Sequence, residues 1–275
     1  MKKILLAFDG SNFSKGVLDY TRVLNEKNPI LLIGAFLPQV NYVSLFSNSA
    51  SGMGGPWVAP SFEGENAEAI QKNIEHFESF CSRNQIEFRV HKDFNDFALP
   101  ELKKETRFAD LLVISSETFY GNIETIEPDI YLKEVLYNLE CPVVLTPENF
   151  EFPTCNILAY DGSESSVYAI KQFAYLFPEL IDNKTILIYA KEKGGEEFPD
   201  EANIEELAAR HFSDLTLTRL ESDPEKYFNT WLMEHGNSIL VSGAFGRSGI
   251  SRLFHKSFVS GIISDHKIPV FIAHK

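Results

Sequence analysis

The chain contains two similar stretches far apart in the sequence, and this repetition constrains the fold more than any other feature. Each is an apolar segment that ends in Asp-Gly-Ser and is followed by apolar residues at helical spacing. One comprises residues 3–11 and the other 156–163, so that Asp9 and Asp161 lie 152 residues apart. A match in residue type, order and spacing predicts an internal structural repeat. We therefore expect one strand-turn-helix unit to begin each half of the chain.

The repeat continues through four more apolar segments in each half, separated by helical patterns. The further expected strands are 29–36, 87–90, 110–115 and 140–146 in the first half, and 185–190, 216–220, 238–242 and 267–273 in the second. Helical patterns cover about 67–83, 99–107, 204–212 and 225–235. Strands that alternate with helices indicate βαβ units and mainly parallel sheets. We expect an α/β protein of two tandem domains, 1–148 and 149–275, each an open five-stranded parallel sheet with helices on both faces.

The first copy is the longer one. Pro142 and Pro269 open matching strands only 127 residues apart, so the first half carries an insertion, which the sequence places at about 37–65. This segment is rich in Gly, Ser, Asn and Pro. A loop of this length is usually either functional or a plain flexible insertion, and both readings stay open.

Composition excludes several classes of protein. The net charge of −14 argues against bulk binding to nucleic acid or anionic lipid. The longest apolar run, 30–37, is too short to span a bilayer, and the start resembles a first strand more than an export signal. Three cysteines and seven histidines show no metal-binding spacing, so we expect no metal site and a cytoplasmic location.

One window stands out chemically, because residues 236–264 contain no Asp or Glu. A buried strand is expected there, followed by a glycine-softened turn with cationic side chains and a helix. Glycines let the backbone approach a ligand, and helix-start amides with local positive charge suit a phosphate. An ordinary strand-turn-helix unit with solvated cations is the alternative. The residues concerned are Gly243, Gly246, Arg247, Arg252, Lys256 and Ser257.

Together these motifs resemble the universal stress protein family, over nearly the whole chain. The resemblance implies an adenine nucleotide alpha hydrolase-like fold and ATP binding. ATP-binding members carry Gly-x-x-Gly, nine residues, and then Gly-Ser or Gly-Thr. Here Gly243 and Gly246 match the glycine pair and Ser257 the hydroxyl position. Lys256 replaces the expected glycine, and it either crowds a phosphate or adds a compensating cation.

The resemblance also implies where a nucleotide would lie. Adenine and ribose are expected near Asp161, Gly162 and Tyr189, with ATP, with or without Mg²⁺, bound in the second domain only. Asp161 would accept ribose hydroxyls, or it is a turn aspartate of the Asp-Gly-Ser corner. Ser163 and Ser165 are expected to cap the following helix.

The first domain departs from this pattern. No Gly-x-x-Gly follows its fourth strand, and residues 117–140 hold six acids against one base, Lys133. A triphosphate would meet repulsion there. We expect a degenerate site in the first domain and a structural role for Asp9.

The leading interpretation is a tandem universal stress protein that acts as an ATP-binding sensor or regulator for a protein partner still unknown. No catalytic residue is identified, and slow ATP hydrolysis is left open. A non-nucleotide interaction protein of the same fold is the main alternative, and a hydrolase or transferase of adenine nucleotides is a third. The two short fifth strands are expected to pair within one chain as a pseudo-twofold dimer. Assembly of chains into a homodimer is left open.

Overall fold

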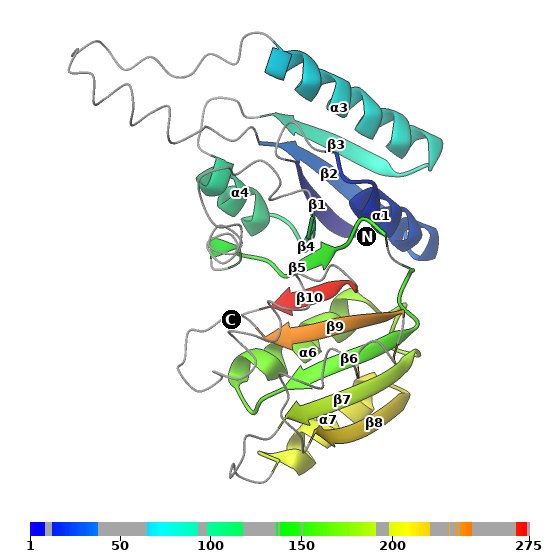
Figure 1. Cartoon of the computed structure of the whole chain (residues 1–275), viewed down its shortest axis with the longest axis vertical. Helices are drawn as coiled ribbons and strands as arrows, with labels where there is room; N and C mark the ends of the chain where they lie inside the picture. Colours follow the sequence, from blue (N-terminus) through cyan, green and yellow to red (C-terminus); the bar gives the residue numbers. More distant parts are fainter. Residues whose placement is uncertain are drawn as a thin grey trace, which may run out of the picture.

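A single continuous sheet of ten strands forms the centre of the molecule and runs along its long axis (Figure 1). The strand order is β3-β2-β1-β4-β5-β10-β9-β6-β7-β8. The computed structural model describes residues 1–8, 13–37, 65–92, 98–117, 136, 138–149, 151–190, 198–220, 231, 235, 237–243 and 268–273. Nearly all of the predicted insertion at 37–65 lies outside these residues.

Both halves contain the elements that the repeat predicts. The first half consists of β1 (Lys2–Phe8), α1 (Lys15–Lys27), β2 (Ile30–Phe36), α3 (Glu65–Arg83), β3 (Glu87–Lys92), α4 (Ala98–Arg107), β4 (Leu111–Ser115) and β5 (Val143–Thr146). The second consists of β6 (Cys155–Tyr160), α6 (Glu164–Leu176), β7 (Lys184–Ala190), α7 (Glu201–His211), β8 (Asp214–Leu220), β9 (Ser238–Gly243) and β10 (Val270–Ala273). The helix expected at 225–235 falls mostly outside the described residues. Within each half all described strand pairs are parallel, which confirms the predicted fold class.

The halves join through their fifth strands, as predicted. β5 and β10 pair antiparallel, with Val144 opposite Phe271 at the centre of the ladder. Every residue of both strands is buried. An unpaired apolar edge would expose backbone N–H and C=O groups, so pairing satisfies them and covers the side chains together.

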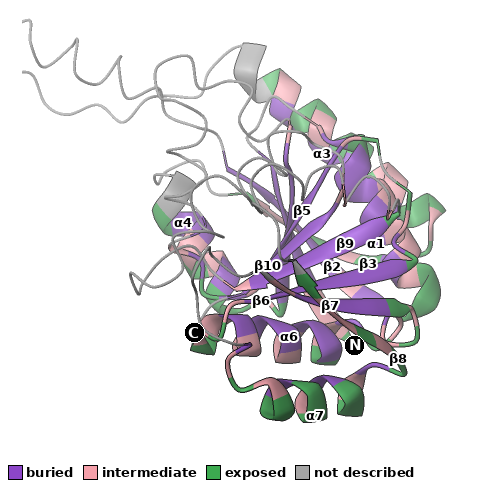
Figure 2. Ribbon diagram, turned by 60° about the horizontal axis from the view of Figure 1, so that its bottom comes forward, coloured by how far each residue is buried: buried purple, intermediate pink, exposed green. Residues whose placement is uncertain are grey.

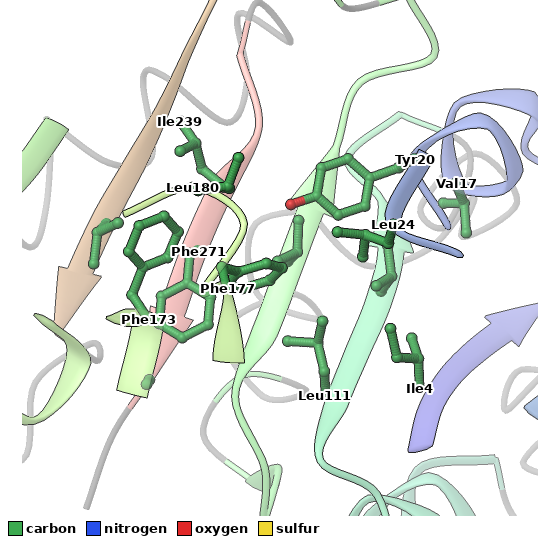
Figure 3. Packing of buried hydrophobic residues seen from close by; sticks show 14 of the residues in the cluster. Ile4, Val17, Tyr20, Leu24, Leu111, Phe173, Phe177, Leu180, Ile239 and Phe271 are labelled. Carbon is green, nitrogen blue, oxygen red and sulfur yellow. The ribbon is translucent and has the colours of Figure 1, made fainter. Parts of the chain in front are cut away.

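Helices cover both faces of the sheet, and the core is therefore split into two layers. In Figure 2 the central strands are buried, whereas the edge strand β8 is partly exposed and the exposed residues of α6 and α7 lie on their outer surfaces. The larger cluster crosses the junction of the halves on the face of α1 and α6 (Figure 3). There Tyr20 and Leu24 of α1 belong to the same buried cluster as Phe177 and Phe271 of the second half.

An ion pair also bridges the two halves. The ammonium group of Lys2 lies 2.8 Å from Oε1 of Glu179 and donates to the carbonyl oxygen of Leu176 at 2.6 Å. It also lies 5.3 Å from the centre of the Phe177 ring. The side-chain amide of Asn28 donates to Oε2 of Glu179 at 3.2 Å. The start of β1 is thereby held to the connection between α6 and β7.

Candidate functional site

Four of the predicted site residues of the second half lie at the carboxyl edge of the sheet, namely Asp161, Gly162, Tyr189 and Gly243. Tyr160 at the end of β6 is level with Tyr189 on β7, and Leu158 is level with Val241 on β9. Asp161 therefore emerges between the ends of β7 and β9. The chain runs from β6 outward to β7 on one side, while β9 lies on the other, so this is the point where the strand order reverses. Open parallel sheets bind ligands in the crevice at such a point.

The Asp-Gly-Ser corner is a tight turn that starts α6. Oδ1 of Asp161 accepts a hydrogen bond from the amide of Ser163 at 2.9 Å, and Gly162 has a φ of 80°. Such a φ favours glycine because it lacks a Cβ. Ser163 is the N-cap, and its hydroxyl oxygen accepts from the amide of Ser166 at 3.1 Å. The capping role of Ser163 is confirmed, whereas Ser165 lies inside the first turn of the helix.

Gly243 places the end of β9 directly against that first turn. A Cβ on Gly243 would lie 2.6 Å from the amide nitrogen of Ser166 and 2.7 Å from the carbonyl carbon of Ser165. Both are backbone atoms, which cannot turn aside as a flexible side chain would. A glycine is therefore required here for packing, whether or not a phosphate approaches it.

An aromatic stack, which the sequence patterns did not indicate, covers the strand ends on the α6 and α7 side. The ring of Phe198 stacks on Tyr160 at 5.6 Å between centroids and contacts Tyr189 in a tilted arrangement at 4.8 Å. The guanidinium carbon of Arg219 lies 5.8 Å from the centre of the Phe198 ring. The one local signal in the sequence is the Phe-Pro-Asp triplet before α7, which is typical of a turn. The side chain of Tyr189 is thus engaged in packing.

Pro199 continues this wall over the Asp-Gly-Ser corner. Its carbonyl oxygen accepts from the hydroxyl of Tyr160 at 3.0 Å, and its Cγ lies 2.7 Å from where a Cβ on Gly162 would be. Burial raises the pKa of the Tyr160 hydroxyl, and the nearby carboxylates of Asp200 and Asp161 add to the effect. Tyr160 therefore stays protonated and keeps donating to Pro199.

The phosphate side of the predicted site lies outside the described residues. This applies to Gly246, Arg247, Arg252, Lys256 and Ser257. Their part in the site, and the effect of Lys256 in place of a glycine, stay predictions.

In the first half the corresponding edge is occupied by a carboxylate of the chain itself. The amide of Gly16 donates to Oε2 of Glu148 at 3.1 Å, and the hydroxyl of Ser115 donates to Oε1 at 2.8 Å. The hydroxyl of Ser14 and the amide of Lys15 donate to it as well. Burial would raise the pKa of the Glu148 carboxyl, but these four hydrogen bonds outweigh burial and lower it.

The described residues offer little support for other chemistry. Within them, no three His, Cys, Asp or Glu side chains lie close enough together to hold a metal ion. Nor does this part of the chain contain a helix long and apolar enough to cross a membrane. The thiols are free and buried, and burial raises the pKa of Cys81 and of Cys141 to about 12. Such thiols do not ionise near neutral pH, so they are poor nucleophiles.

Comparison with known proteins adds evidence on the fold. No model of a protein family matches the chain, and no similar sequence is found among curated proteins. A crystal structure of a universal stress protein from Archaeoglobus fulgidus DSM 4304 is similar, with a TM-score of 0.72 and 15% identity over 100% of this chain and 96% of that one. Another, described under the same family name, comes from Pseudomonas aeruginosa UCBPP-PA14; it gives a TM-score of 0.53 and 12% identity over 99% and 93% of the two chains. The chain therefore has the fold of the universal stress proteins over its whole length.

Proposed function

We propose that the chain is a tandem universal stress protein, with domains at 1–148 and 149–275, whose second domain binds ATP or a related adenine nucleotide as a sensor or regulator. The observation that carries this proposal is the meeting of Asp161, Gly162, Tyr189 and Gly243 at the edge where the strand order of the second half reverses. The family resemblance implies a nucleotide at these same residues.

The Asp161 carboxylate suits a ribose. Among the described residues, the amide of Ser163 is its one hydrogen-bond donor, and it uses Oδ1. Oδ2 therefore keeps acceptor capacity for a sugar hydroxyl. The turn role and the ligand role of this residue are compatible, since a carboxylate accepts several hydrogen bonds.

Charge favours the second half over the first. The acid-free segment 236–264 contains β9 and the residues that follow it, whereas Glu117 and Glu148 lie just beyond β4 and β5. An anionic ligand avoids carboxylates and is drawn to cations and backbone amides. One nucleotide per chain is the expected stoichiometry.

Calorimetric titration of the nucleotide-stripped protein with ATP, with and without Mg²⁺, tests the proposal. Asp161→Asn is the sharpest variant, because its amide oxygen can still accept from Ser163 and the turn survives while the charge is lost. Gly246→Val tests the glycine motif without disturbing the packing that Gly243 requires. Asp214→Asn, on the outer strand β8, is the matched control.

We expect saturable binding at one site per chain, weakened about tenfold or more in the first two variants and unchanged in the control. Absence of binding by the unaltered protein would refute the nucleotide proposal. It would leave the interaction protein of the same fold as the better account.

A further inference from the structure

In the first half, the side chain of Glu148 lies at the edge that corresponds to the candidate ligand site of the second half. Its carboxylate lies at the start of α1, where amides of a helix point outward and favour an anion. Two of its donors, Lys15 and Gly16, are such amides, and a third, Ser115, comes from the end of β4. The donors thus come from both sides of the point where the strand order of the first half reverses.

The backbone is shaped for this contact. A Cβ on Gly16 would lie 2.2 Å from the carbonyl oxygen of Pro147 and 2.8 Å from the Cα of Glu148. Only glycine lets the segment after β5 approach α1 so closely. Glu148 is further held by its own amide, which donates to Oε1 of Glu117 at 3.0 Å.

The repeat shows that the two halves differ at this position. Leu111 is level with Ile4 and Ile239 is level with Asn156, so Ser115 of the first half corresponds to Gly243 of the second. Glu148 follows Pro142 at the same spacing at which Lys275 follows Pro269. A hydroxyl donor and a carboxylate in the first half thus match a glycine and a cation in the second.

We propose that Glu148 is an internal ligand, whose carboxylate fills an anion-binding cradle made by Ser14, Lys15, Gly16 and Ser115 and so closes the first half to anions from solution. The cradle is selective for a small carboxylate, because Glu117 stands beside it and would repel a larger polyanion. This inference rests on the first half alone and does not depend on nucleotide binding by the second.

Chemical rescue tests the proposal. Glu148→Ala removes the carboxylate and leaves the four donors in place, and sodium formate is the probe that can replace it. Glu151→Ala is the matched control, since it removes an exposed carboxylate from the same connecting segment. Tm is measured by calorimetry at increasing formate, with chloride at equal ionic strength as the reference.

We expect Glu148→Ala to melt several degrees below the unaltered chain and to regain stability in formate. At ten times its dissociation constant, a ligand at one site raises Tm by about 3 °C in a chain of this size. The unaltered chain and Glu151→Ala should show no formate-specific rise. Equal formate effects in all three proteins would overturn the proposal, as would a Tm of Glu148→Ala equal to that of the unaltered chain.

A second variant guards against a failure to fold. Glu148→Gln keeps the size and one acceptor oxygen but loses the charge, so it should fold with a Tm about 2 °C or more below that of the unaltered chain. Formate should not raise that Tm, because the cradle remains filled. An unchanged Tm in this variant would show that the charge of Glu148 is not bound, and the proposal would fail.

Discussion

The ion pair between Lys2 and Glu179 offers a quantitative test of how the two halves are held together. Lys2→Met removes the cation and keeps most of the apolar length of the side chain. The side chains of Lys2 and Glu179 are only 17% and 5% exposed. The change therefore leaves a buried carboxylate that still accepts a hydrogen bond from the side-chain amide of Asn28.

The expected cost follows from this burial. Removing one partner of a fully buried ion pair destabilises a protein by about 3–5 kcal/mol. Some water reaches Lys2, so we expect a value near the lower limit, about 3 kcal/mol, or a fall in Tm of about 6 °C for a chain of this size. Glu179→Gln should cost less, about 1–2 kcal/mol, because the ammonium group of Lys2 keeps the Leu176 carbonyl oxygen and the Phe177 ring.

A double-mutant cycle isolates the pair. Urea unfolding of Lys2→Met, Glu179→Gln and the double variant should yield a coupling energy of about 2 kcal/mol. A second cycle with Arg89→Met and Glu87→Gln is the control, because this pair lies 4.0 Å apart with side chains 65% and 53% exposed and should contribute no more than about 0.5 kcal/mol. A coupling energy for Lys2 and Glu179 no larger than that of the control would refute the reasoning that burial strengthens this contact.

Three further outcomes are expected. Gly243→Ala should lower the free energy of unfolding by about 1–3 kcal/mol, since its Cβ would press on the Ser166 amide; an unchanged urea midpoint would contradict this. Tyr160→Phe should cost about 1 kcal/mol through loss of the hydrogen bond to Pro199, again measured in urea, and a stabilised variant would count against that bond. Because folding lowers the pKa of Glu148, its carboxylate stabilises the folded chain fully above the ordinary glutamate pKa of about 4.3. This stabilisation is lost as pH falls through the lowered pKa of the folded state. The free energy of unfolding of Glu148→Gln should therefore fall less between pH 6 and pH 3 than that of the unaltered chain. An equal fall in the two proteins would argue against this.

The architecture could be predicted from the sequence because its signals are local or repeated. Apolar runs mark the strands, and the second Asp-Gly-Ser shows that the same unit recurs. The pairing of β5 with β10 was expected because each is a short apolar strand at the edge of its own half, with a partner on one side only. Among the described strands the differences lie at the ends, as in β10, which begins at Val270, where its register with β9 starts.

The site was predicted less completely, because its remaining parts depend on contacts between distant segments. Nothing local to Phe198 shows that its ring will stack on Tyr160, 38 residues earlier in the chain. Glu148 looks like an ordinary linker acid until the fold brings it to the start of α1. Likewise, the glycine motif pointed to a ligand at Gly243, whereas the structure adds a packing reason for the same residue.

The antiparallel seam between β5 and β10 also bears on how the two halves could come to differ. In a protein built from two identical chains, every substitution at such a seam or in a ligand site appears twice. Joining the halves in one polypeptide keeps them together at a high effective concentration that does not depend on how much protein is present. Each half is then free to acquire its own residues, as at Ser115 and Gly243. The covalent link thus permits a division of labour that symmetry would forbid.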